Sequence, residues 1–167
     1  LGDSVLPIVN FNKIKNIIVL RSLSKTAGLA GLRIGFALGN ENLIDRLLRV
    51  TGPYDINSFA VTAAFATLTD QDYIDNYVKE VLKSREWIKG KLSKYNVKYH
   101  MESGNYFLIW PNNDPDKVEF TLRENGILIR NMKDKLLING SIRVSIGTTK
   151  QMEKFWEAYK IADKLIH

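Results

Sequence analysis

The chain has 167 residues, which is enough for one ordinary domain or for part of a larger protein. Its 45% hydrophobic and 10% aromatic content is typical of a packed globular protein and excludes a disordered tail. The absence of cysteine excludes disulfides, thiolate metal sites and a cysteine nucleophile, and suits a reducing compartment. No apolar run reaches the roughly 20 residues of a membrane span, and no leader pattern opens the chain. We therefore expect a cytoplasmic protein without a membrane partner.

The basic charge raises the question of a nucleic-acid partner, because the formal net charge is +6 and the pI is near 9.4. Lysine and arginine nevertheless alternate with aspartate and glutamate along the chain, and only residues 83–94 are locally basic. Those residues have an amphipathic helix pattern, so a solvated helix face explains the charge. We expect no nucleic-acid partner. A nucleic-acid binder is the third interpretation, and it would require steeply salt-dependent binding.

The first part of the chain has an α/β pattern. The apolar run 16–20 is typical of a parallel strand buried on both faces, and a glycine-rich turn leads to a second strand at 33–38. Residues 41–50 predict a helix with one apolar face, and the uncharged segment 57–68 predicts a buried or an interface helix. A parallel sheet needs several strands, so we expect residues 1–70 to be an incomplete domain.

A long amphipathic helix is predicted over residues 70–95, where the composition also changes. Two strands follow within 97–110, interrupted at Ser103-Gly104. Asp114-Pro115 has the N-cap and first-turn order of a new helix, which Gly126 ends. The boundary near Thr69-Asp70 predicts two domains, residues 1–70 and residues 71–167.

The end of the chain predicts two short strands, 127–130 and 142–146, and a last helix. Thr148 and Gln151 have the spacing of a capping box at the start of that helix. Its inward-facing residues are expected to be Met152, Phe155, Trp156, Tyr159 and Ile166.

Chemically reactive residues converge on the turn after the first strand. A lysine such as Lys25 can condense with an aldehyde when its amine loses its proton. Ser22 and Ser24 can donate hydrogen bonds to phosphate oxygens, and the guanidinium of Arg33 can grip a phosphate at two points. The glycines between them do not have P-loop or dinucleotide-binding spacing. The residues indicate a site for a phosphorylated carbonyl compound, although a polar turn with an ordinary lysine remains open.

The segment 22–36, Ser-Leu-Ser-Lys-x-x-Gly-Leu-x-Gly-Leu-Arg-Ile-Gly-Phe, resembles the pyridoxal-phosphate (PLP) lysine segment of fold-type-I aminotransferases. The resemblance implies an α/β fold, namely the C-terminal part of the PLP-dependent transferase fold. Residues 1–70 would end the large PLP-binding domain and residues 71–167 would form the small domain. It also implies that Lys25 is the catalytic, cofactor-bound lysine and that Ser22, Ser24 and Arg33 contact the phosphate of PLP.

The resemblance extends over essentially the whole chain. Similar segments are Pro53-Tyr54-x-x-Asn57-Ser58, Ser103 to Phe107, Leu122 to Arg130 and Ser141 to Thr148. The last two are particularly similar to histidinol-phosphate aminotransferases, in which the matching arginines are associated with the anionic end of the substrate. The resemblance therefore implies substrate contacts at Arg130, Arg143 and Asn105.

The local pattern around Arg143 also bears on its role. In a strand, Ile142 and Val144 point to one face and Arg143 points to the other. A guanidinium held in a short strand can clamp a carboxylate or a phosphate, and a surface ion pair is the alternative. The two histidines, His100 and His167, have no ligand or triad spacing, so we expect no metal site.

The resemblance implies transamination of histidinol phosphate with 2-oxoglutarate, which yields glutamate, by a PLP-dependent homodimer in histidine biosynthesis. Two relatives of the same family remain open as alternatives, a threonine-phosphate decarboxylase and an aromatic-amino-acid aminotransferase. A non-catalytic α/β interaction module is the alternative from another class. In the family, the residues that hold the cofactor ring precede the position of Leu1. Residues 1–167 alone are therefore expected to bind little PLP and to be inactive.

Overall fold

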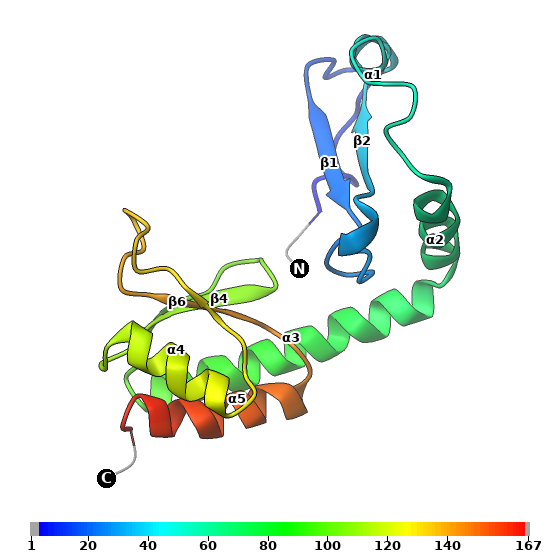
Figure 1. The fold of residues 1–167 in the computed structure, drawn as a ribbon. Helices are drawn as coiled ribbons and strands as arrows, with labels where there is room; N and C mark the ends of the chain where they lie inside the picture. Colours follow the sequence, from blue (N-terminus) through cyan, green and yellow to red (C-terminus); the bar gives the residue numbers. More distant parts are fainter. Residues whose placement is uncertain (1–3, 166–167) are drawn as a thin grey trace. The chain divides into compact units, whose positions relative to one another are not determined.

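The computed structural model describes residues 4–165 (Figure 1). Ile166, which was expected to face the core, lies outside the described residues. Internal contacts divide the chain into two compact units, one up to Tyr77 and one from Val78 onward. This division falls within helix α3 (Gln71–Lys94), and each unit is described by itself. No helix in the described range is long and apolar enough to cross a membrane.

The N-terminal unit is built on an antiparallel pair of strands, β1 (Ile18–Ser22) and β2 (Gly35–Gly39). The expected parallel strand buried on both faces is therefore wrong. Leu20 in β1 is 75% exposed, and among the described residues of this unit no other segment pairs with the two strands. Parallel strands need a crossover connection, usually a helix, whereas only the 3-10 turn η1 (Ala30–Leu32) lies between β1 and β2. The short connection returns the chain antiparallel.

Two helices complete this unit, α1 (Glu41–Leu48) and α2 (Ser58–Thr69). The side chains of Asn40 and Asn57 cap their N-termini. Only a narrow stripe of α2 is buried, at Ala60 and Ala64, and this stripe packs on the turn between β1 and β2. The small core consists of Leu23, Ala27, Ile34, Ala60 and Ala64. Most of the rest of α2 is exposed, so within the described residues it is not a buried helix.

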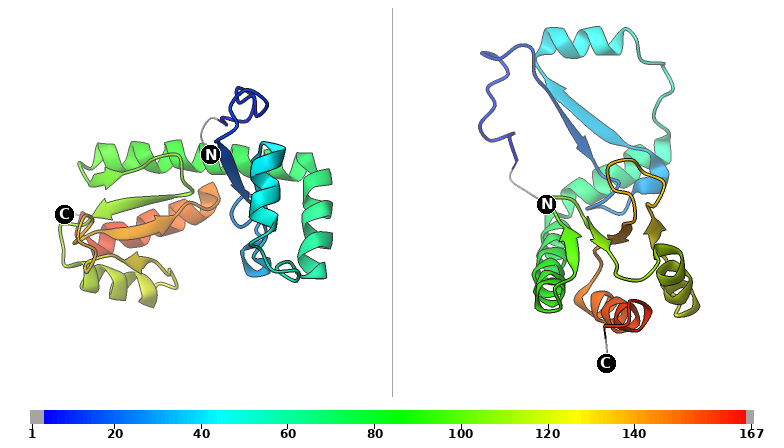
Figure 2. Two further views of the ribbon diagram at one scale, coloured as in Figure 1. Left: turned by 90° about the horizontal axis from the view of Figure 1, so that it is seen from above. Right: turned by 90° about the vertical axis from the view of Figure 1, so that its left-hand side faces the viewer.

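The C-terminal unit is a two-layer α/β structure (Figure 2). Its antiparallel sheet has the order β3-β4-β6-β5. The strands are β3 (Lys98–His100), β4 (Tyr106–Trp110), β6 (Ile142–Ser145) and β5 (Arg130–Asn131). The helices α3, α4 (Pro115–Glu124) and α5 (Thr149–Ala162) lie on one side of this sheet.

Alternation along the strands builds the core between the two layers. Phe107, Ile109, Ile142 and Val144 are at most 3% exposed and point toward the helices. The helices contribute the fully or almost fully buried side chains Ile88, Leu92, Val118, Leu122, Phe155, Trp156 and Tyr159. The opposite face of the sheet carries Arg143 together with the apolar side chain of Leu108.

The predicted helix signals of this unit are confirmed, and one predicted strand is wrong. Asp114 caps α4, and Thr148 with Gln151 forms the capping box of α5. The strand expected at 127–130 overlaps β5 only at Arg130. The reason is that the amide of Ile127 donates instead to the carbonyl of Leu122, at 2.9 Å, in the turn that ends α4. The amide of Ile127 is therefore used at the end of α4 and does not bond to a neighbouring strand.

Candidate active site

The turn between β1 and β2 alternates buried apolar and outward polar residues. Leu23, Ala27 and Ile34 are 6–7% exposed, and they pack on the alanine stripe of α2. Lys25 and Arg33 lie between them and are exposed. Because the apolar residues hold the turn against α2, the polar side chains of the same turn are presented outward.

The two serines are connected through the backbone. Ser22 is the last residue of β1, and its hydroxyl accepts a hydrogen bond from the amide of Ser24 at 3.1 Å. The carbonyl of Lys25 accepts from the amide of Gly28 at 3.2 Å, and Gly28 has a φ of +69°. These bonds shape the backbone around Lys25. The amine of Lys25 has no hydrogen-bond or ion-pair partner among residues 4–165.

Arg33 follows η1 in a left-handed conformation, with a φ of +55°. This conformation is uncommon for a residue other than glycine and is often found at functional positions. Its guanidinium donates to the carbonyl of Ala30 at 3.3 Å. The other guanidinium N–H groups have no partner in the described residues and are available for a ligand. Lys25, Ser22, Ser24 and Arg33 therefore lie on one turn that can offer an amine, two hydroxyls and a guanidinium.

A second group of candidate residues lies on the open face of the C-terminal sheet. Arg143 is half-buried in β6 and points away from the core, as the alternation predicts. Its guanidinium carbon lies 5.3 Å from the ring centroid of Tyr106, within cation–π range. The aromatic ring thereby restricts the directions in which this arginine can point.

Arg130 lies directly beside Arg143. The two residues are paired in the register of β5 and β6, so their side chains project from the same face of the sheet. Like charges in this position destabilise a sheet. Neither arginine has an ion-pair partner within residues 4–165. An anion that accepts hydrogen bonds from both guanidiniums would remove the repulsion, and a carboxylate or phosphate has the required geometry.

Asn105 directly precedes β4. Its carbonyl accepts from the amide of Ile146 at 2.8 Å, which extends the contact of β4 and β6 by one residue. Asn105 therefore lies at a different position in the sheet from the arginine pair. It is not among the residues that line the cavity beside Arg143, which is described next. No group of three or more histidine, aspartate and glutamate side chains that could hold a metal occurs in the described part of the chain.

The cavity next to Arg143 has a volume of about 300 Å³. Its lining residues are His100, Glu102, Gly104, Tyr106, Leu108, Met132, Ile138 and Arg143. The imidazole of His100 and the carboxylate of Glu102, whose Nε2 and Oε1 atoms lie 3.8 Å apart, were not expected here. The register of the strands is the signal that would have placed His100 near Arg143, because His100 pairs with Leu108 and Leu108 pairs with Arg143.

Comparison with known proteins places these residues in a family. The model of the family described as aminotransferase class I and II matches residues 2–158. The chain belongs to this aminotransferase family. A histidinol-phosphate aminotransferase of Geotalea uraniireducens is 37% identical over 160 residues, covering 95% of this chain and 45% of the relative. This aminotransferase chain thus spans less than half the length of the curated relatives it matches.

Solved aminotransferase structures have the same fold. A histidinol-phosphate aminotransferase from Sinorhizobium meliloti in complex with pyridoxal-5'-phosphate has a TM-score of 0.76 and 25% identity, covering 90% of this chain and 42% of its own. The L-threonine-O-3-phosphate decarboxylase from Porphyromonas gingivalis has a TM-score of 0.69 and 21% identity, covering 92% and 49%. The mixed α/β structure of this aminotransferase chain is therefore part of the fold that these proteins share.

Proposed function

We propose that this chain forms part of a PLP-dependent aminotransferase that transfers the amino group of histidinol phosphate to 2-oxoglutarate, producing glutamate. The observation that carries the proposal is the outward-facing Lys25, which shares one anchored turn with Ser22, Ser24 and Arg33. The family match and the names of the relatives support it. We further propose a cytoplasmic homodimer that acts in histidine biosynthesis.

The residues of the turn fit the chemistry of PLP. The cofactor combines a phosphate with an aldehyde, and the turn combines phosphate-binding groups with a primary amine. Ser22, Ser24 and Arg33 would hold the phosphate, and Lys25 would bind the aldehyde carbon. When bound, PLP supplies an electron sink for the bonds at the substrate Cα. The amine of Lys25, released once the amine of the substrate has taken its place at the aldehyde carbon, would remove the proton from that Cα and later return a proton, as a general base and acid.

The arginine pair would bind the anionic end of both substrates. Histidinol phosphate carries a phosphate where 2-oxoglutarate carries a carboxylate, and a planar guanidinium can accept either group. Arg143, oriented by the ring of Tyr106, would provide the fixed half of this site. Arg130, exposed at the sheet edge, would provide the second half. We also propose that Asn105 contacts the substrate, on the resemblance alone.

A decarboxylase of the same family is the second candidate. The fold similarity to threonine-phosphate decarboxylase favours it, and an arginine pair suits its phosphate-bearing substrate equally well. The reaction products separate the two proposals. Transamination produces glutamate from 2-oxoglutarate, whereas decarboxylation releases carbon dioxide and needs no amino acceptor. An aromatic-amino-acid aminotransferase would instead prefer substrates without phosphate.

The lysine assignment can be tested in the full-length protein, meaning a chain of the relatives' length that contains residues 1–167. With PLP, wild-type protein should show the visible absorbance of lysine-bound cofactor, and Lys25→Ala should lose this band and at least 99% of the transaminase activity. Borohydride reduction and peptide mapping should place the label on Lys25. Lys15→Ala, at an exposed lysine of the same unit, serves as the control and should retain both. A label on another lysine would refute the assignment.

A further inference from the structure

We propose that Asp116 is a positioning residue that keeps Arg130 in line with Arg143 by tethering the strand on which Arg130 lies. The inference rests on the proposed function, because it concerns the anion-binding arginine pair. Asp116 belongs to α4, and it contacts neither arginine. Its effect passes through Asn131 and Lys133, which follow Arg130 in the chain.

The tether consists of hydrogen bonds at both carboxylate oxygens. Oδ1 of Asp116 accepts from Nδ2 of Asn131 at 2.8 Å, and Oδ2 pairs with the Nζ of Lys133. The side chain of Asn131 in turn accepts from the backbone amide of Lys133 at 3.0 Å. One carboxylate thus holds two residues of the same strand end, and these two residues also hold each other.

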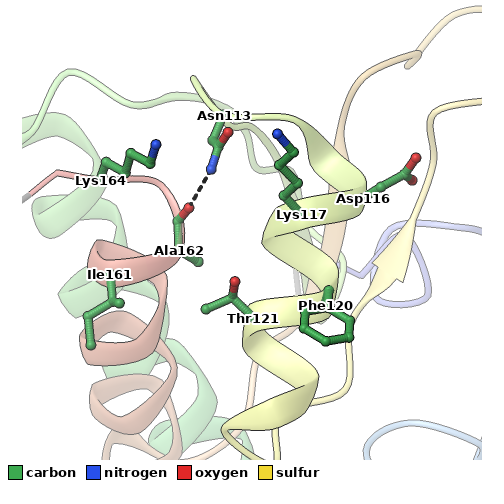
Figure 3. Close-up of a pocket in the computed structure, with 8 residues that line it drawn as sticks. All are labelled: Asn113, Asp116, Lys117, Phe120, Thr121, Ile161, Ala162 and Lys164. Carbon is green, nitrogen blue, oxygen red and sulfur yellow. Dashed lines mark hydrogen bonds between the residues drawn. The ribbon is translucent and has the colours of Figure 1, made fainter.

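Asp116 is itself firmly placed. It is the second residue of α4, after Pro115, and its amide donates to the N-cap side chain of Asp114 at 2.8 Å. The helix is anchored by the fully buried Val118 and Leu122. A carboxylate is also stabilised near a helix N-terminus. Figure 3 shows the side chain of Asp116 leaving α4 on the side away from Ile161 of α5.

Arg130 depends on such an anchor because β5 is weakly held. This strand has only two residues and lies at the edge of the sheet. The residues before it, 127–129, are outside the ladder, and after it the amide of Met132 bonds to the carbonyl of Ser141 at 2.9 Å. The guanidinium of Arg143 repels Arg130 until an anion lies between them. Without the tether, only the two-residue ladder and the Met132–Ser141 bond would oppose this repulsion, and the arginine pair would widen.

This reasoning predicts a kinetic pattern. An anion that binds both guanidiniums also holds them together, so Asp116 matters most before the substrate is bound. In the full-length holoenzyme, Asp116→Ala should raise the KM for histidinol phosphate about fivefold to tenfold, with kcat changed less than twofold. Asp116→Asn should have an intermediate effect, because its amide oxygen can still accept from Asn131 but cannot pair with the charge of Lys133.

A double-mutant cycle separates positioning from a general structural role. In an Arg130→Ala background, Asp116→Ala should change KM less than twofold, because the residue it positions has been removed. In an Arg143→Ala background its effect should be smaller than in the wild type, because the repulsion that the tether opposes has been removed. The matched control is Glu119→Ala, which removes an ion pair within the same helix, to Arg123, and should leave KM unchanged. Equal effects of Asp116→Ala in the wild-type and the Arg130→Ala backgrounds would overturn the inference.

Inorganic phosphate provides a readout that does not depend on catalysis. Phosphate should raise the thermal midpoint of the full-length wild-type protein, and both Arg130→Ala and Asp116→Ala should shift this dependence to about fivefold higher phosphate. If wild-type protein lacks transaminase activity but keeps this pattern, the proposed function fails and the inference stands. If activity is present but Asp116→Ala leaves both KM and phosphate binding unchanged, the inference fails and the function stands.

Discussion

Gly35 allows the strand pair to approach closely enough to support the lysine turn. A Cβ built at this position would lie 2.8 Å from the backbone carbonyl oxygen of Arg21, which cannot rotate away. Gly35 is also the register partner of Ser22, one of the proposed phosphate-binding residues. A side chain here must therefore push apart the strands that define the turn.

Gly35→Ala should lower the free energy of unfolding by about 1–3 kcal/mol, the usual cost of forcing atoms into a packed site. It should also weaken PLP retention by the full-length protein, measured as the PLP concentration that half-restores the visible band. Gly31→Ala is a matched control from the same turn, since its Cβ would meet nothing within 4 Å. It should stay within about 0.5 kcal/mol of wild type. Equal behaviour of the two variants would contradict this account.

At the residue scale, the sequence predicts whether a side chain is buried better than it predicts which residue that side chain bonds to. The inward orientation of Tyr159 follows from helical spacing and is confirmed by its full burial. Its hydroxyl donates to the buried carboxylate of Asp163 at 2.9 Å, and burial with this negative charge raises the pKa of Tyr159. The same carboxylate accepts from the amide of Asn113 at 2.7 Å. That contact joins segments distant in sequence, and no local pattern predicts it.

At the scale of elements, α3 is joined to the start of α5 by a carboxylate. Glu80 accepts from the amide of Thr149 at 2.9 Å, and the hydroxyls of Ser84 and Thr149 lie 3.2 Å apart. The bond from the Thr149 amide is the main cause that lowers the pKa of Glu80. A carboxyl group with a lowered pKa stabilises the folded state above its unfolded pKa of about 4.3. That stabilisation is lost as the pH falls through the lowered value.

Glu80→Gln should therefore flatten the acid side of the stability profile. Between pH 7 and pH 3, the thermal midpoint of the wild-type protein should fall more than that of the variant. Only the wild type has the carboxylate of Glu80, whose hydrogen bond weakens when the group is protonated. Glu86→Gln, an exposed position on the same helix 3.9 Å from Lys89, is the control and should follow the wild type. Parallel curves for wild type and Glu80→Gln would contradict the assignment.

Helices were predicted better than strands, for a physical reason. The caps Asp114 and Thr148 and the 3.6-residue spacing are local signals, so they predicted α4 and α5 closely. Strand pairing depends on partners elsewhere in the chain. The apolar run at the start of β1 looks the same whether its neighbour is parallel or antiparallel, and the backbone of Ile127 was taken by a helix end.

At the scale of the whole molecule, the family was the most predictable property. The segment around Lys25 is long and specific, and the family match over residues 2–158 confirms what it indicated. The roles of Lys25, Arg33, Arg130 and Arg143 remain predictions. The pairing of the two arginines came only from the register of β5 and β6, because twelve residues of intervening chain separate them in the sequence.

The exposed face of α2 has a consequence for handling residues 1–167 on their own. Phe59 is 83% exposed and Phe65 72% exposed, on a helix without a single charge. Large apolar side chains exposed to water on one helix favour contact with other apolar surfaces. At high concentration, a protein consisting of residues 1–167 should self-associate and bind hydrophobic dyes, which light scattering and dye fluorescence would record. The double variant Phe59→Ser, Phe65→Ser should show less of both. A monodisperse sample without dye binding would mean that these rings are covered.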